Sequence, residues 1–89
     1  LKKSAEEIGC IMIDYEMPEM NGKELMLLIK EYWSFKGMRG VPIYCCSGNI
    51  DTEFKENMKQ SGFTEVYAKP LNWRKVVADV KMVLANDNF

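Results

Sequence analysis

Residues 11–22 read IMIDYEMPEMNG, and this stretch decides the expected fold. It opens within an apolar run, 10–13, which is typical of a short strand covered on both faces in a parallel sheet. Asp14 follows the run directly, and the stretch from 14 to 22 contains the proline, asparagine and glycine that mark a loop. We therefore expect a buried strand that ends beside a carboxylate.

The rest of the chain alternates helical and strand patterns. Residues 1–8 resemble the end of a helix. The further expected elements are a helix from 23 that ends at Gly37 and Gly40, a strand at 41–46, a helix at about 51–61 that stops at Gly62, a strand at 63–68 and a last helix after Asn72. Asn21, Asp51 and Asn72 are the expected helix N-caps. This order predicts an α/β fold with a parallel sheet and right-handed crossovers.

Composition excludes several classes of function. The chain has 89 residues, of which 47% are hydrophobic and 28% charged, with no His and a formal net charge of -1. The length fits one domain or part of one. Because acidic and basic residues nearly balance, the composition gives no sign of a basic surface that would bind nucleic acid or an anionic membrane. No apolar run approaches the roughly 20 residues of a membrane span. Without His, this chain has no imidazole base and no His-ligated zinc.

The cysteines favour a reducing, cytoplasmic setting. There are three of them, Cys10, Cys45 and Cys46, and an odd number without a CxxC pair does not indicate a disulfide framework. We expect Cys45 and Cys46 to be small buried residues of a strand. The alternatives are a vicinal disulfide and a small redox protein that uses this pair.

Three polar side chains are expected at the carboxyl ends of the strands. Asp14 follows the first strand, Ser47 the second and Lys69 the third. Taken singly, they also fit a turn former, a turn serine and a solvated lysine. In open parallel sheets, however, ligands bind at this edge, and adjacent strands lie about 4.8 Å apart. A carboxylate nucleophile, a hydroxyl donor and an ammonium together suit the chemistry of a phosphoryl group.

At these residues the chain resembles a known family. Segment 11–22 is similar to the phosphoacceptor loop of response-regulator receiver domains, the CheY-like modules of two-component and phosphorelay signalling. Segments VPIYCCSGN (41–49) and GFTEVYAKPLN (62–72) resemble the family's fourth and fifth strands. The resemblance implies a flavodoxin-like three-layer sandwich that is incomplete. Residues 1–89 would form a partial receiver domain, from the end of the family's second helix through its fifth, with the third to fifth strands.

The resemblance also implies roles for site residues. Asp14 would be the phosphorylated aspartate, while Ser47 and Lys69 would hold phosphoryl oxygens. Glu16 would offer its backbone carbonyl to Mg²⁺ and place its side chain near the hydrolytic water. Other implied roles belong to Pro70, which would shape the Lys69 peptide, to Gly22, which would let the backbone turn beside the site, and to Asn49, at a position where the family tunes dephosphorylation.

Two departures from the family pattern stand out. The adjacent acidic pair that binds Mg²⁺ with the aspartate has no counterpart, and Glu6 and Glu7 stand at the wrong end of the first strand to replace it. We therefore expect this chain alone to be a weak phosphoacceptor or none. The family often has an aromatic residue three positions before the lysine, where this chain has Val66. Tyr67 comes one place later and is expected on the opposite sheet face.

The leading hypothesis is a phosphoacceptor whose partner is a histidine kinase or a histidine phosphotransfer protein. The alternative is a degenerate receiver that acts only in protein–protein interaction. No independent enzyme is expected, because receivers promote only their own phosphotransfer and dephosphorylation. The polar end of the chain favours the carboxyl-terminal receiver of a hybrid histidine kinase. The strand at 10–13 would lie at an exposed edge, through which the chain could self-associate.

Overall fold

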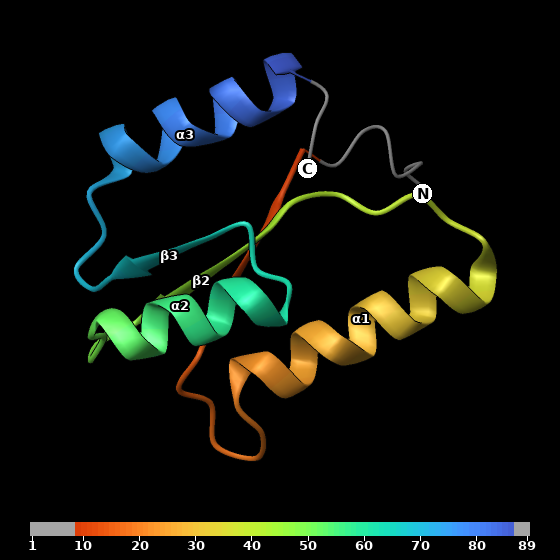
Figure 1. Cartoon of the computed structure of the whole chain (residues 1–89), viewed down its shortest axis with the longest axis horizontal. Coiled ribbons are helices and arrows are strands. Elements are labelled where there is room, and N and C mark those ends of the chain that lie inside the picture. Colours follow the sequence, from red (N-terminus) through yellow and green to blue (C-terminus); the bar gives the residue numbers. More distant parts are fainter. Residues whose placement is uncertain (1–8, 87–89) are drawn as a thin grey trace.

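The computed structural model describes residues 9–86 and contains three strands and three helices in alternation (Figure 1). Their bounds are β1 Ile11–Asp14, α1 Gly22–Lys36, β2 Ile43–Ser47, α2 Thr52–Ser61, β3 Glu65–Ala68 and α3 Trp73–Asn86. The alternation predicted from the sequence is confirmed within this range. The helix end expected at residues 1–8 lies outside the described residues.

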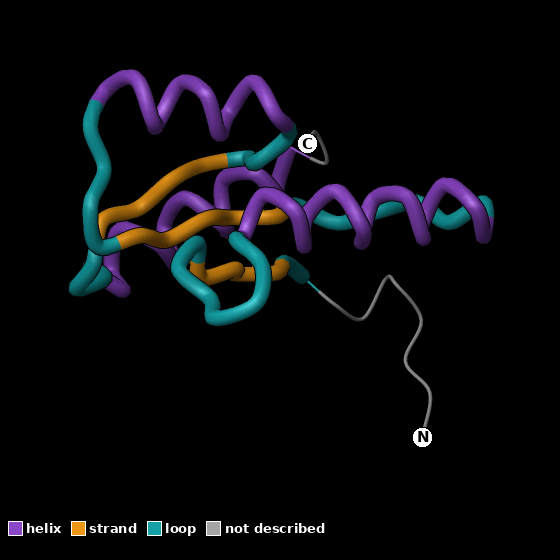
Figure 2. Tube along the Cα trace, turned by 90° about the horizontal axis from the view of Figure 1, so that it is seen from below, coloured by secondary structure: helices purple, strands orange, loops and turns teal. Residues whose placement is uncertain are grey.

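The strands form one parallel sheet in the order β1-β2-β3, so β2 is central (Figure 2). Helices α1 and α2 cover one face of the sheet and α3 covers the other (Figure 1). This is the three-layer α/β arrangement that the sequence predicted. Because all strands run in the same direction, their carboxyl ends lie at one edge.

Each sheet face has its own core, and strand alternation decides which residues enter it. On the α1/α2 face, Met26 and Met58 pack against the sheet, and on the α3 face Val76 packs against two tyrosines. The strand residues on the first face are Ile13, Ile43, Cys45 and Val66, and those on the second are Tyr44 and Tyr67. Val66 and Tyr67 therefore point to opposite faces, as expected from the period of two.

The helix termini follow the predicted caps. The Asn21 side chain accepts a hydrogen bond from the Glu24 N–H at 2.9 Å, and the Glu24 carboxylate accepts one from the Asn21 N–H at the same distance, which makes a capping box. Asp51 caps α2 by accepting from the Phe54 N–H at 2.8 Å. Gly37 ends α1 with φ 68°, a left-handed conformation that glycine adopts without a Cβ penalty.

The strand bounds differ slightly from the predicted ones. Asp14 and Ser47 are the last residues of β1 and β2, although both were expected just beyond the strands. The third strand is shorter than predicted and starts at Glu65, and Lys69 follows it as expected. The extension arises because the ladder continues through the pair Asp14 and Cys46 and the pair Ser47 and Ala68.

The core on the α1/α2 face of the sheet can be tested by substituting two neighbouring residues of α1. Met26 is fully buried, whereas the Leu27 side chain points outward and is 47% exposed. We expect Met26→Ala to lower the free energy of unfolding by about 2–5 kcal/mol, since it deletes a buried side chain and leaves a cavity. Leu27→Ala should change it by less than about 0.5 kcal/mol. Urea unfolding of both variants measures this, and equal losses would contradict the assigned helix face.

Candidate functional site

The three polar residues predicted at the strand ends meet at one edge of the sheet. Asp14 ends β1, Ser47 ends the central strand β2, and Lys69 directly follows β3. The Lys69 ammonium Nζ lies 2.8 Å from Asp14 Oδ2. Because this contact joins residues from the two outer strands, the ammonium reaches across the end of β2, where Ser47 lies with only 1% of its surface exposed.

Glu16 completes the group, with both of its carboxylate oxygens engaged. The Ser47 hydroxyl donates a hydrogen bond to Glu16 Oε2, and the Gly48 N–H donates to Oε1 at 3.2 Å. The Lys69 Nζ lies 3.5 Å from the same Oε1. The sequence had indicated only a backbone role and a place near water for this residue. Its position two residues after Asp14 was the available signal, but a rotamer is not readable from spacing.

Backbone hydrogen bonds fix the loops that carry these side chains. The Tyr15 N–H donates to the Cys46 carbonyl at 2.8 Å, and the Lys69 N–H donates to the Ser47 carbonyl at 2.9 Å. The Glu16 N–H donates to Asp14 Oδ1 at 3.0 Å, which orients the carboxylate. The peptide between Lys69 and Pro70 is cis. The site is therefore held by the main chain on all three strands.

Two further residues from the sequence prediction lie close by. A Cβ on Gly22 would stand 2.9 Å from Tyr15 Cα and 3.0 Å from the Asp14 carbonyl oxygen, so only glycine fits where α1 starts beneath the loop. The Asn49 N–H donates to Ser47 Oγ at 3.3 Å. The hydroxyl of Ser47 therefore accepts from one neighbour while it donates to Glu16.

The charges at the site stabilise one another. The hydrogen bond from Lys69, helped by the Glu16 N–H, lowers the pKa of the Asp14 carboxyl. The hydrogen bonds from Ser47 and from the Gly48 N–H lower the pKa of Glu16. The hydrogen bond to Asp14 raises the pKa of Lys69. All three groups are consequently charged at neutral pH, and two carboxylates share one ammonium.

The cysteines do not form a second reactive site. All three are free thiols, and Cys45 and Cys46 lie buried in β2. Burial raises the pKa of Cys45 to about 12 and raises that of Cys46 above its ordinary value. Since a thiol reacts as its thiolate, these side chains are inert parts of the sheet, as the simpler sequence interpretation held.

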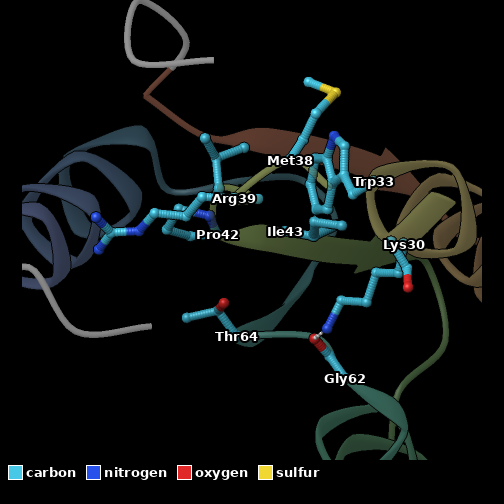
Figure 3. Close-up of a pocket in the computed structure, with 11 residues that line it drawn as sticks. Lys30, Trp33, Met38, Arg39, Pro42, Ile43, Gly62 and Thr64 are labelled. Carbon is cyan, nitrogen blue, oxygen red and sulfur yellow. Dashed lines mark hydrogen bonds between the residues drawn. The ribbon is translucent and has the colours of Figure 1, made fainter. Parts of the chain in front are cut away.

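A pocket of about 480 Å³ lies at the opposite end of the sheet, beside Ile43, the first residue of β2. Figure 3 shows Lys30 extending across it to the Gly62 carbonyl, to which it donates a hydrogen bond of 2.9 Å. That carbonyl follows the last turn of α2, where a cation is favoured. The lysine therefore links α1 to α2, and the pocket is remote from Asp14.

A comparison with models of known protein families shows which family the chain belongs to. The family model for the response regulator receiver domain matches residues 2–81. The chain belongs to this family. The receiver domain of the Francisella response regulator 1452 matches the structure with a TM-score of 0.72 and 21% identity, over 90% of this chain and 62% of that one. This likeness confirms the receiver fold.

A curated relative is much longer than this receiver domain. The hybrid signal transduction histidine kinase M of Dictyostelium discoideum is 24% identical over 86 residues, which cover 97% of this chain and 4% of that protein. This chain, a receiver domain of the two-component type, is thus similar to a small part of that kinase.

The helices within residues 9–86 are too short or too polar to span a bilayer.

The contact between Lys69 and Asp14 can be tested through the pKa of the Asp14 carboxyl group. We expect Lys69→Met to raise the pKa of Asp14, because the variant removes the hydrogen bond that stabilises the carboxylate. Lys75→Met is the matched control, since Lys75 lies 3.4 Å from Asp79 and not at the site. Carbon-13 NMR titration of the Asp14 carboxyl measures both, and an unchanged pKa in Lys69→Met would contradict the contact.

The stability of the folded chain should decrease as the pH falls into the acid range. Because the folded-state pKa values of Asp14 and Glu16 are lowered, the unfolded chain binds more protons in acid. Their contribution is present above the ordinary carboxyl range and is lost as pH falls through the lowered values. We expect the Lys69→Met variant to lose less stability than the parent chain on acidification, as measured by urea unfolding at a series of pH values.

Proposed function

We propose that this receiver domain accepts a phosphoryl group on Asp14 from a phosphohistidine of a partner protein. The contact of 2.8 Å between Lys69 Nζ and Asp14 Oδ2 supports this most strongly. An ammonium held at this distance would neutralise charge on a phosphoryl group attached to the carboxylate. The Ser47 hydroxyl lies at the end of the neighbouring strand and offers a donor to a phosphoryl oxygen.

The proposed transfer uses Asp14 as a nucleophile, which requires an ionised carboxyl group. Lys69 favours that form by lowering the pKa of Asp14. One carboxylate oxygen forms a bond to phosphorus while the bond between phosphorus and the imidazole nitrogen breaks. The nitrogen keeps the electron pair, so the partner histidine is released and an acyl phosphate remains on Asp14.

Receiver domains generally bind Mg²⁺ at an acidic pocket. Among residues 9–86 there is no cluster of three or more His, Cys, Asp or Glu side chains that would hold a metal ion. Asp14 and Glu16 lie 2.8 and 3.5 Å from the Lys69 ammonium. Mg²⁺ needs near-octahedral oxygen ligands, and two carboxylates that share one ammonium do not supply enough of them on their own; the Glu16 backbone carbonyl stays a proposed ligand. We therefore propose that the chain alone is a weak phosphoacceptor.

The partner proposed for this site is a histidine kinase or a histidine phosphotransfer protein, since these carry phosphohistidine. The similarity to a hybrid histidine kinase supports the kinase, although the chain spans only 4% of that relative. A cytoplasmic location is proposed with it, and the three free thiols fit a reducing compartment.

The second candidate function is a receiver that only binds other proteins. Two observations favour it. Val66, which stands where the family often has an aromatic residue, is buried in the core under α2 and is 3% exposed. The described residues also lack a metal-binding acidic cluster. The ordered contact of Asp14 with Lys69 favours phosphorylation instead, because mere binding does not require it.

Phosphotransfer can be tested with a small acyl phosphate donor, Mg²⁺ and intact-mass spectrometry. We expect sub-stoichiometric modification of the parent chain and none of Asp14→Asn, which lacks the nucleophile. Lys69→Ala should lower the rate by on the order of a hundredfold, because it removes the charge that stabilises the phosphoryl group. Lys75→Ala, a lysine outside the site, should match the parent.

The outcomes separate the two functions. Modification of Asp14→Asn to the parent's extent would contradict phosphorylation at this residue. Complete and stable modification of the parent would contradict the expectation of a weak acceptor. No modification at any donor concentration would favour the receiver that only binds.

We also propose self-association through the outer edge of β1, which was predicted to be exposed. Within the described residues β1 pairs only with β2. The Ile11 and Tyr15 N–H groups donate to Pro42 and Cys46 carbonyls at 3.0 and 2.8 Å. By alternation the backbone groups of Met12 point away from β2, where a second copy could pair with them.

Analytical ultracentrifugation tests whether the chain self-associates through the outer edge of β1. We expect a concentration-dependent dimer for the parent chain. Met12→Pro should remain monomeric, because it removes an outward N–H and proline is tolerated at sheet edges. Circular dichroism should confirm that Met12→Pro stays folded. A parent chain that is monomeric at every concentration would contradict this interface.

A further inference from the structure

The Glu16 carboxylate contacts two hydrogen-bond donors and one ammonium at the end of the sheet. Its Oε2 accepts from the Ser47 hydroxyl, and its Oε1 accepts from the Gly48 N–H at 3.2 Å. The Lys69 ammonium lies 3.5 Å from Oε1. A hydroxyl, a backbone amide and an ammonium that converge on one carboxylate make a cradle for an oxyanion. We call Ser47, Gly48 and Lys69 the anion cradle.

The cradle is anchored at the end of the sheet, whereas its occupant comes from an exposed loop. Ser47 is the last residue of the central strand and is buried, and its carbonyl accepts from the Lys69 N–H at 2.9 Å. The Glu16 side chain, in contrast, comes from the loop after β1 and is half exposed. Water can therefore solvate the Glu16 carboxylate as soon as it swings out.

A second anion on Asp14 would need the same donors. Asp14 Oδ2 already lies 2.8 Å from the Lys69 ammonium. A phosphoryl group attached to this carboxylate carries a charge of about -1.5 to -2. The Ser47 hydroxyl has one proton and donates one hydrogen bond at a time. The phosphoryl group and the Glu16 carboxylate thus compete for one proton and one ammonium, and their like charges repel.

We propose that Glu16 is an internal competitor: its carboxylate occupies the anion cradle in the resting domain and must leave before a phosphoryl-type oxyanion can bind there. This inference rests on the proposed function for its biological meaning, since it names a regulatory contact of the same site. The contact holds the cradle closed to stray anions and makes occupancy by phosphate a two-state exchange, with Glu16 either in or out.

Inorganic phosphate is a probe of the cradle that does not require phosphorylation. Binding is followed by NMR through the Gly48 amide, in the parent chain, Glu16→Gln and Glu16→Ala. Glu16→Gln keeps the shape and removes the charge, and Glu16→Ala removes both. If the carboxylate fills the cradle about nine-tenths of the time, the affinity for phosphate should rise about tenfold in Glu16→Ala. Glu16→Gln should lie between the alanine variant and the parent.

Glu19→Gln is the matched control, because Glu19 lies on the same exposed loop and makes none of the cradle contacts. It should bind phosphate like the parent. Thermal melting of each variant should show that all remain folded. The modification of Asp14 by an acyl phosphate donor is then compared among the same four proteins, and we expect it to increase several-fold in Glu16→Gln and Glu16→Ala.

The two readouts distinguish failure of this inference from failure of the proposed function. Tighter phosphate binding in the Glu16 variants, with no modification of Asp14 in any protein, would support the competitor and refute the phosphoacceptor. Equal phosphate affinity and equal Asp14 modification in the parent and the Glu16 variants would overturn the competitor and leave the phosphoacceptor in place.

Discussion

The contact between the Lys69 ammonium and the Asp14 carboxylate holds the functional site together. It joins the ends of the two outer strands across the central one. Such a contact is available only if all three strands run in the same direction and end in register, since each residue along a strand adds about 3.3 Å. The parallel order β1-β2-β3 and the ladders up to Asp14 and Ser47 satisfy that condition.

The same geometry explains why one ammonium serves two acids. Asp14 ends β1 and Glu16 lies two residues further along the chain, where its N–H donates to Asp14 at 3.0 Å. This turn brings both carboxylates to Lys69. The Ser47 hydroxyl and the Gly48 N–H then decide which of the two carboxylates holds the cradle. A site built this way carries an excess of negative charge, so a further anion enters only when one carboxylate gives up its donors.

Much of the fold was predictable because it depends on periodic patterns and on caps. Asn21, Asp51 and Gly37 act through local hydrogen bonds or local dihedrals, so their roles were readable from their neighbours. The opposite faces of Val66 and Tyr67 followed from strand alternation alone. The strand limits were off by one or a few residues, because the ladder that sets them depends on partners distant in sequence.

The site was predictable in its members and not in its internal contacts. Asp14, Ser47 and Lys69 were identified because strand ends in a parallel sheet share one edge. The hydrogen bond between Ser47 and Glu16 depends on the Glu16 rotamer and on where the turn at Ser47 and Gly48 lies relative to it. Neither can be predicted from the spacing of residues in the sequence. The close approach at Gly22 was expected, whereas its distance to the Asp14 carbonyl needed coordinates.

A crystal structure of the chain at a resolution that defines lysine side chains tests where the Lys69 ammonium lies. We expect the Lys69 nitrogen within hydrogen-bond distance, about 2.7–3.2 Å, of an Asp14 carboxylate oxygen, with the Ser47 hydroxyl beside them. A separation of more than about two strand widths (roughly 10 Å), or side chains at opposite ends of the sheet, would contradict it.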